Sequence, residues 1–404
     1  MESPTDPYVI PNSRRAIRIR CFTTLLLEYS MLRRIALLFV MLYVFVPFVF
    51  GQSEEGNIQM FGYFQASYEN VFPRAGRKSQ SSFSLQQLNL MVARDLSPSF
   101  NAFVNFEVTN SFSSDLNWGS FRLEEAWVRY YHNNLLSVKA GLLVPEFNGL
   151  NEIKNKTPLL PYIFRPFVYE RSISDLADLN DFVPQQAYIQ LYGTQTVGES
   201  EFEYAVYIGN SEEEYSNSTT GNLIVRGVDS VTWKTVGGRL GFDGEGIRLG
   251  TSLTFDKDKI QNSPVTDVPR TRLGVDLSVH VSDWTFDGEL ITVGHTLTNE
   301  QNNLLLATAM PAIGRTGTLG QLFYYGLLNY DFTEKIYAYI SYDYLHDRAS
   351  NSLAQGVHMY TVGGGFRPAT SVVIKAQFYR LQILDSPLFR IDEDHALVAV
   401  SVSF

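Results

Sequence analysis

Hydrophobic and polar residues alternate along most of this chain from Asn57 onward, in repeated stretches of about ten residues. In the stretch 246–256, the odd positions are Ile, Leu, Thr, Leu and Phe, whereas the even positions include Arg248, Ser252 and Asp256. Successive side chains of a strand point to opposite faces, so each stretch has one apolar and one wet face. The pattern predicts strands between lipid and water, and no amphipathic helix of useful length.

The last nine residues, 396–404, form such a stretch and run without a turn residue to the terminal Phe404. Ala396, Val398, Val400, Val402 and Phe404 share one face, and mostly small or polar residues occupy the other. An edge strand of a soluble sheet is the alternative for this segment taken alone. Within a barrel, it would be the closing strand and would pair with a first strand near residues 57–69.

The connections between the stretches alternate between short and long, as in bacterial outer-membrane barrels. Short links are expected at 95–99, 132–134, 194–200, 243–246, 282–283, 331–335 and 368–371. Long polar links are expected at 70–82, 110–120, 145–185, 210–231, 257–270, 295–318, 346–356 and 385–394. Seven short and eight long links predict an all-β fold: a transmembrane antiparallel β-barrel of about 16 strands.

Aromatic residues at strand ends are expected to form girdles at the two membrane surfaces. They are Tyr68, Trp127, Tyr130, Trp284, Tyr324, Tyr330, Tyr342 and Tyr344. A closed barrel also leaves no unpaired strand edge in the bilayer.

The segment 31–51 has the pattern of a secretory signal peptide: Arg33 and Arg34, an apolar run from Ile35 to Phe50, and small residues before Gln52. A single-pass anchor is the alternative, but the run is shorter than the roughly 20 residues that span a bilayer. Residues 1–30 precede Met31 and are interpreted as an over-extended start or a cytoplasmic leader. Residues 52–404 are expected to form one barrel domain.

Charge and cysteine content narrow the class of protein. Removing residues 1–51 takes six Arg and three acidic residues from the 32 basic and 42 acidic residues, which leaves 26 and 39. This acidic balance argues against nucleic acid, which binds clustered Lys and Arg. The single cysteine, Cys21, lies in the removed part, so no disulfide is expected in an exported chain. The mean hydropathy of -0.07 does not fit a helical membrane protein.

Several motifs resemble the phosphate-selective porin O and P family of bacterial outer-membrane porins. They are FSLQQLNLMVARDLSPSF at 83–100, LEEAWVRY at 123–130, SVKAGLLVPEFNG at 137–149, YAVYIGN at 204–210 and YDYL at 342–345. The resemblance covers most of residues 57–404 and implies a sixteen-stranded, trimeric channel whose third external loop folds into the lumen. Phosphate itself is not implied, because phosphate channels line the lumen with cationic donors.

The longest connection, 145–185, contains four prolines after Pro145 and is expected to be the inserted constriction loop of the pore. Its candidate constriction residues are Lys154, Lys156, Arg165, Glu170, Arg171, Asp175, Asp178 and Asp181. A basic first half facing an acidic second half would set a transverse field across the narrowest point. A surface loop with solvated charges is the alternative.

Strand parity assigns charges of both signs to the lumen wall. They are Glu107, Glu125, Arg129, Lys139, Glu203, Arg239, Arg248, Asp256, Arg272, Asp276, Asp287, Glu289, Asp343 and Lys375. Opposite charges such as Glu125 and Arg129 could instead pair across strands and stiffen the wall.

Aromatic residues on the wet face could form a sugar slide or pack against the loop. They are Phe61, Tyr63, Trp127, Tyr188, Tyr192, Tyr337 and Tyr339.

The sequence predicts a porin for passive diffusion of small hydrophilic solutes or ions in the bacterial outer membrane. The six histidines have no metal-ligand spacing, and no enzyme activity, metal or cofactor is expected. Expected partners are outer-membrane lipid, lipopolysaccharide, the barrel assembly machinery through the C-terminal strand, and two further copies of the chain. A phosphate- or anion-selective porin, or a blocked barrel serving as surface receptor or scaffold, is the alternative; a barrel hydrolase is a more distant one.

Overall fold

The computed structural model describes residues 58–73, 79–110, 120–170, 182–184, 186–211, 233–258, 265, 267–308, 318–347, 356–383 and 391–404. They belong to one compact unit, Gly56–Phe404. The start region 1–30 and the signal peptide 31–51 that the sequence predicts lie outside the described residues.

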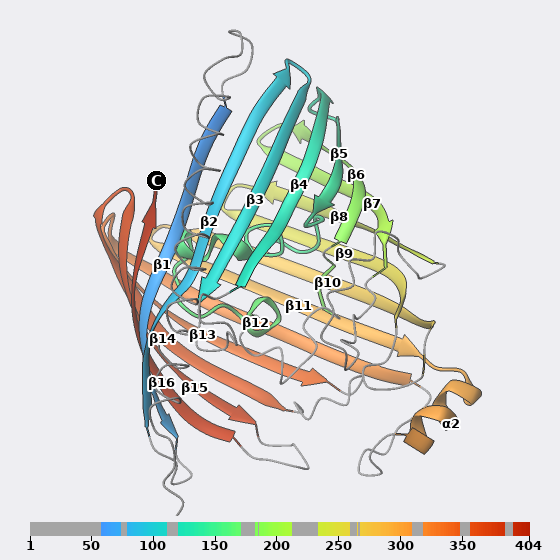
Figure 1. Cartoon of the computed structure of the whole chain (residues 1–404). Helices are drawn as coiled ribbons and strands as arrows, with labels where there is room; N and C mark the ends of the chain where they lie inside the picture. Colours follow the sequence, from blue (N-terminus) through green and yellow to red (C-terminus); the bar gives the residue numbers. More distant parts are fainter. Residues whose placement is uncertain are drawn as a thin grey trace, which may run out of the picture. The chain divides into compact units, whose positions relative to one another are not determined.

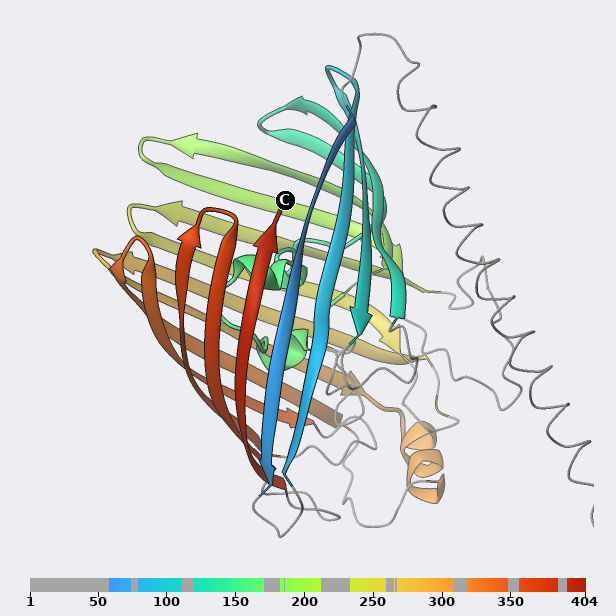
Figure 2. The ribbon, with the colours of Figure 1, turned by 60° about the vertical axis from the view of Figure 1, so that its left-hand side comes forward.

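Sixteen antiparallel strands form a closed barrel, in which each strand pairs with its neighbours in sequence and β1 pairs with β16 (Figures 1 and 2). The strands are β1 Ile58–Pro73, β2 Gln80–Ser97, β3 Phe100–Asn110, β4 Ser120–Asn133, β5 Leu136–Leu143, β6 Gln186–Val197, β7 Ser200–Asn210, β8 Lys234–Gly244, β9 Ile247–Asp258, β10 Val268–Val281, β11 Trp284–Thr296, β12 Thr318–Thr333, β13 Ile336–Asp347, β14 Val357–Ala369, β15 Val372–Ile383 and β16 Ile391–Ser403. The predicted barrel of about 16 strands is confirmed.

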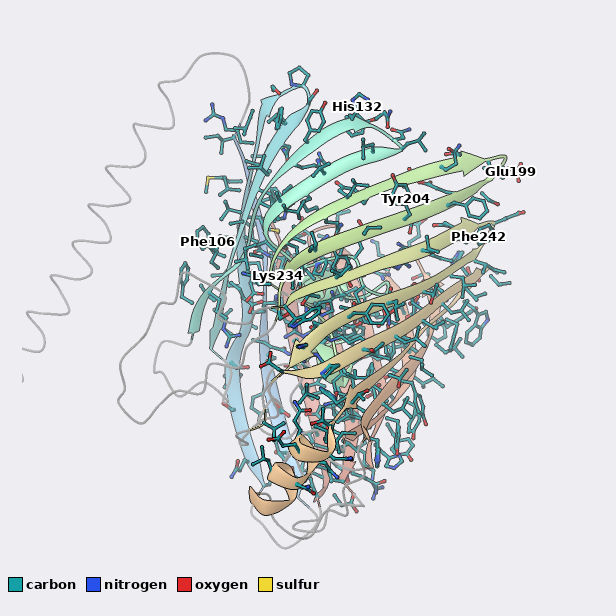
Figure 3. The ribbon with its side chains drawn as sticks, turned by 90° about the vertical axis from the view of Figure 1, so that its right-hand side faces the viewer. Phe106, His132, Glu199, Tyr204, Lys234 and Phe242 are labelled. Carbon is teal, nitrogen blue, oxygen red and sulfur yellow. The ribbon has the colours of Figure 1, made fainter. Side chains whose placement is uncertain are left out.

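The polar and apolar faces are arranged in the opposite sense to those of a soluble protein. On β8, Leu240 points outward and is 65% exposed, whereas its neighbour Arg239 is buried inside the barrel. Figure 3 shows this outer face, with Tyr204 and Phe242 pointing away from the barrel. An apolar band outside and polar side chains inside are what a lipid-embedded barrel requires.

The connections follow the predicted rhythm. The seven short links join the strand pairs β2–β3, β4–β5, β6–β7, β8–β9, β10–β11, β12–β13 and β14–β15 through two residues each. Gly198, Gly246 and Ser282 have positive φ in three of these turns. The eight long links begin and end at the opposite ends of the strands, and several strands extend further into the predicted links than expected, such as β10, which includes Arg270.

One long link contains the helix α2, Asn299–Thr308, which the sequence did not predict. Thr298 and Gln301 exchange backbone-to-side-chain hydrogen bonds of 3.0 and 3.2 Å and so form a capping box at its start. The described helices of this chain are all too short or too polar to cross a membrane.

β16 closes the barrel, as predicted. It pairs with Tyr63–Pro73 of β1, so the partner segment lies slightly beyond the predicted 57–69. Val398 and Val400 are exposed on the outside, whereas Leu397, Ala399 and Ser401 are buried inside. The backbone of Phe404 exchanges two hydrogen bonds of 2.9 Å with Gly62. Both Ile58 and Phe404 lie at the end of the barrel that carries the short turns (Figure 2).

The outer aromatic residues pair across strands near both ends of the barrel. Tyr68 contacts Phe83 with ring centroids 4.7 Å apart, and Trp284 contacts Tyr330 at 4.6 Å. Trp127 departs from the predicted girdle because its side chain points into the lumen, where its ring stacks on Phe103.

Candidate functional site

The long connection after β5 folds into the barrel, as predicted for an inserted loop (Figures 1 and 2). Its described part comprises residues 144–170 and 182–184, with short 3-10 helices η1 at Lys154–Leu159 and η2 at Phe167–Tyr169. The alternative of an external surface loop is therefore wrong, because the loop contacts inner-face residues of strands far apart in sequence.

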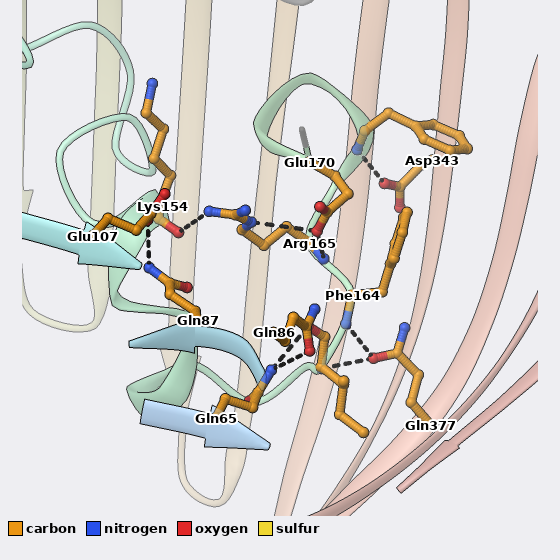
Figure 4. Close-up of polar contacts among 12 residues, drawn as sticks. Gln65, Gln86, Gln87, Glu107, Lys154, Phe164, Arg165, Glu170, Asp343 and Gln377 are labelled. Atoms are coloured by element: carbon orange, nitrogen blue, oxygen red, sulfur yellow. Dashed lines mark hydrogen bonds and ion pairs between the residues drawn. The ribbon is translucent and has the colours of Figure 1, made fainter. Parts of the chain in front are cut away.

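Wall amides hold the centre of the loop (Figure 4). The Ile163 carbonyl accepts hydrogen bonds from Gln65 and Gln86, with the closer at 2.9 Å. On the other side, the backbone N–H groups of Ile163 and Phe164 donate to Gln377 Oε1 at 2.7 and 3.0 Å. An irregular segment has backbone groups that need partners, and the wall supplies them.

Carboxylates of the barrel wall also accept hydrogen bonds from the loop. Asp343 accepts a hydrogen bond from the Phe167 N–H at 3.2 Å. Glu289 accepts one from the Leu150 N–H at 2.6 Å and one from the Tyr169 hydroxyl at 2.5 Å. Two side chains predicted to line the water path are thus anchors of the loop.

An apolar cluster fills the space between the loop and β11–β16. Its loop side includes Phe147, Ile163, Phe167 and Phe182, all buried. Its wall side consists of Ile291, Val293, Phe323, Tyr325, Leu327, Tyr337, Tyr339, Leu345, Val357, Met359, Tyr379, Leu381, Ile383, Leu397 and Ala399. Large apolar side chains in contact across this surface stabilise the inserted position of the loop.

The predicted constriction residues divide into three groups. Lys154, Arg165 and Glu170 are buried inside the barrel. Lys156 is exposed. Arg171, Asp175, Asp178 and Asp181 lie outside the described residues, so the transverse field proposed for the loop stays a prediction.

Arg165 connects the loop to the opposite wall. Its Nε lies 3.4 Å from a carboxylate oxygen of Glu170, and its Nη1 donates to the Lys154 carbonyl at 3.2 Å. The guanidinium group points toward Glu107 on β3 (Figure 4). Glu107 in turn accepts a hydrogen bond from Gln87 at 2.9 Å.

A β-bulge in β4 adds a carboxylate that strand parity missed. The register between β3 and β4 shifts after Asn105, which pairs with Glu125, while Phe106 pairs with Leu123. Glu124 is the extra residue and is buried, and Glu125 faces the lumen and accepts a hydrogen bond from Trp127 Nε1 at 3.0 Å. A bulge turns two successive side chains to similar sides, which no alternation count can show.

The remaining wall charges mostly pair across β7–β10. Arg239 contacts Glu203 at 3.0 Å and Asp276 at 2.7 Å, and Arg248 contacts Glu203 at 3.3 Å. Asp256 accepts hydrogen bonds of 2.8 Å from Arg270 and Arg272. Arg270 was missed because the sequence placed it at the edge of a long connection.

The suggested pair Glu125–Arg129 is not formed. Arg129 lies opposite Asn101 and Lys139 in the sheet. Lys139 contacts the loop through Glu152 at 3.4 Å, and its ammonium lies 5.1 Å from the ring centre of Trp127.

At the opposite wall, Lys375 is buried and donates hydrogen bonds of 3.2 Å to Gln65 Oε1 and the Tyr162 carbonyl. It therefore also holds the loop.

Four of the aromatic residues of the wet face form two groups. Tyr337 and Tyr339 pack in the cluster with the loop. Phe61 lies apart from that cluster, beside Phe103, and the Trp127 ring stacks on Phe103 with ring centroids 4.9 Å apart. The packing interpretation holds for the first group, and a slide made by the second stays a prediction.

Burial alters the acidity of loop groups. The pKa of Glu146 is raised to about 8, first by burial and then by the nearby Glu152 carboxylate. Burial also raises the pKa values of the Tyr162 and Tyr169 hydroxyls. Within the described residues, no His, Cys, Asp and Glu side chains gather as a metal site would require.

Solved outer-membrane channels have a similar fold. An anion-selective porin from Comamonas acidovorans has a TM-score of 0.59 at 15% identity, covering 87% of this chain and 100% of that one. The outer-membrane channel DcaP of Acinetobacter baumannii has 0.57 at 11% identity, covering 88% and 99%. OprB of Pseudomonas putida has 0.58 at 9% identity, covering 86% and 94%.

At these identities the likeness shows the fold alone: a closed sixteen-stranded barrel of the kind found in bacterial outer-membrane porins. No family model matches the chain, and no curated protein matches its sequence.

Proposed function

We propose that this protein is a porin of the bacterial outer membrane, in which small hydrophilic solutes or ions diffuse passively through a water-filled lumen. One observation carries the proposal. An apolar outer face surrounds a charged inner face, and a loop held by Gln65, Gln377 and Asp343 narrows the interior. No chemical step and no cofactor is part of this function.

The apolar outer face of the barrel indicates which molecules would surround it in the outer membrane. Lipid and lipopolysaccharide would contact the apolar band, and the barrel assembly machinery would recognise β16 with its terminal Phe404. We further propose a homotrimer, in line with the trimer form described for OmpT of Vibrio cholerae, which has a TM-score of 0.54 at 10% identity. Crosslinking in native membranes would measure the number of copies, and a single band of one chain would contradict the trimer.

Weak cation preference is the selectivity that the charges support. Arg270 and Arg272 contact Asp256, and Lys375 binds a loop carbonyl, so these bases are engaged with the protein itself. Glu107 lies on the wall that Arg165 faces, and Glu124 is buried on the neighbouring strand β4. A phosphate channel would need cationic donors directed at the water path.

Planar-bilayer recording of the refolded protein tests the function. Stepwise conductance openings in salt solution are expected. A folded, heat-modifiable barrel that stays electrically silent would overturn the channel and favour a surface receptor or scaffold.

Reversal potentials in a potassium chloride gradient then test the selectivity. We expect a small potential whose sign reports preference for potassium. A clear preference for chloride would contradict this and favour the anion-selective or phosphate-selective alternative.

A further inference from the structure

A cavity of about 150 Å³ lies in the lumen between the inserted loop and the inner face of β9–β12. The loop contributes Gly149–Leu150 and Leu160–Tyr162, and the wall contributes three carboxylates, the guanidinium group of Arg248 and an aromatic ring. Only some of these lining residues hold the loop in place. The rest forms a surface directed at an empty space large enough for a small molecule.

The charges around the cavity do not cancel. Arg248, Glu203, Arg239 and Asp276 form a continuous chain of ion pairs with two bases and two acids, so this chain is balanced. Glu289 and Asp287 remain as further carboxylates of the lining.

Neutral groups are the hydrogen-bond donors to both remaining carboxylates. Glu289 binds the Leu150 N–H and the Tyr169 hydroxyl. Asp287 lies opposite Ser278 in the sheet and is hydrogen-bonded by its hydroxyl, and Arg248 adds electrostatic attraction from its own pair with Glu203. The cavity is therefore acidic, and a cationic ligand would be favoured there.

The rest of the cavity lining is apolar and aromatic. Tyr162 and Tyr325 contribute rings, and Leu150, Leu160 and Leu327 contribute aliphatic groups. Inorganic ions gain little from such a surface, whereas an organic cation places its methyl or methylene groups against it. Aromatic faces combined with carboxylates are the chemistry that recognises ammonium groups.

We propose that this cavity is a binding subsite for small organic cations, such as molecules with a quaternary or primary ammonium group. The inference deepens the proposed porin function and rests on it in one respect: the solute reaches the cavity through the lumen. Asp287 and Glu289 attract the charge, and Tyr162 and Tyr325 surround it with aromatic surface.

Equilibrium dialysis of the full refolded barrel in micelles tests the subsite with choline and its neutral isostere, 3,3-dimethylbutan-1-ol. A protein-free micelle sample corrects for partitioning of the alcohol. We expect choline to bind about tenfold or more tightly than the alcohol, because only choline carries the charge. Equal binding of the two, or no binding of choline, would overturn the proposal.

Asp287→Asn keeps the shape of the side chain and removes its charge. We expect it to weaken choline binding about tenfold and to leave binding of the alcohol unchanged. Glu199→Gln is the matched control, since Glu199 lies on the exposed turn between β6 and β7 (Figure 3), and choline binding should be unaffected. An unchanged choline affinity in Asp287→Asn would contradict the site.

Conductance of the same preparations in sodium chloride separates the two proposals. Absence of choline binding together with normal conductance would contradict the proposed subsite and still support the porin function. Choline binding by a barrel that conducts no current would contradict the porin function and still support the proposed subsite.

Discussion

Asp256 is buried between two arginines on the inner face of β9 and β10. Its two carboxylate oxygens accept hydrogen bonds of 2.8 Å from Arg270 and Arg272, and all three side chains are almost completely buried. Removing one member of a buried ion group is costly because the desolvated charges of the others remain. Asp256 is thus a structural residue of the wall as well as a lumen charge.

Asp256→Asn should therefore lower the free energy of unfolding by about 3 kcal/mol. Urea unfolding of the barrel in detergent micelles measures the change. Glu199→Gln, which removes a carboxylate from an exposed turn, should stay within about 0.5 kcal/mol of the parent protein. An equal effect of the two substitutions would show that the buried group adds no stability.

Glu146 ties the start of the loop to β6. Its N–H donates to Gln190 Oε1 at 3.0 Å, and Gln190 Nε2 donates to its carboxylate at 2.9 Å. Because its pKa is raised to about 8, the docked loop favours the neutral carboxyl. Docking is then most favourable below the ordinary pKa of 4.5, weakens as the pH rises toward 8, and changes no further above it.

Single-channel recordings between pH 5 and 9 should show current fluctuations that increase as the pH rises from 5 toward 8 and then level off. Glu146→Gln keeps a neutral hydrogen-bonding side chain, so its fluctuations should not depend on pH in this range. A pH dependence that persists in Glu146→Gln would assign it to another group.

The inserted loop has no regular structure apart from the two short 3-10 helices, and its position depends on a few wall side chains. Gln377 Oε1 accepts hydrogen bonds from Ile163, Phe164 and the Tyr339 hydroxyl, so one amide fixes two backbone groups of the loop. The apolar cluster holds the same segment by packing. Loss of the amide should loosen the loop without releasing it.

Gln377→Ala is expected to give larger and noisier single-channel currents than the parent protein, because two buried N–H groups lose their acceptor. Gln195→Ala on the exposed end of β6 is the control and should leave the currents unchanged. Identical currents in Gln377→Ala and the parent would mean that packing alone positions the loop.

The closing strand β16 is followed by Phe404, whose ring packs against β1. The Phe404 ring lies 6.5 Å from that of Phe64 and covers Gly62, where an added Cβ would lie 2.8 Å from the ring. Gly62 thus leaves room for the terminal aromatic residue at the seam between β1 and β16.

Phe404→Ala should lower the yield of heat-modifiable barrel on semi-native gels severalfold, because the seam loses an apolar contact at its last residue. Phe404→Tyr keeps the ring and should assemble normally. Normal assembly of Phe404→Ala would exclude a role for the terminal ring.

Selectivity belongs to the whole barrel, because it depends on which wall the loop charges face. Arg165 lies among carboxylates from the loop and from β3 (Figure 4). Arg165→Gln should increase the preference for potassium over chloride in reversal-potential measurements, since a positive charge leaves the lumen. Lys335→Gln, on an exposed turn, should have no such effect. A shift toward chloride in Arg165→Gln would contradict the placement of Arg165 beside the water path.

The alternation of residues predicted the strands, the seven tight turns and the closing role of 396–404, because side-chain direction in a strand depends on position parity alone. The same parity failed at Glu124, where a bulge inserts a residue. Arg270 has the parity of the other inward residues of β10, and it was missed because residues up to 270 were assigned to a long connection, whereas β10 begins at Val268. The helix α2 has a capping box at Thr298 and Gln301, a local signal that does not depend on the apolar periodicity of an amphipathic helix.

Local alternation in the chain, together with the requirement that a bilayer leaves no backbone group unpaired, was sufficient to establish the barrel. The partners of the inner charges depended on folding, since contacts such as Gln65–Ile163 and Phe167–Asp343 join residues about 100 and 176 positions apart. No sequence pattern encodes which wall an irregular loop meets. The anchoring of the loop and the acidic cavity beside it therefore became visible only once the strands closed around it.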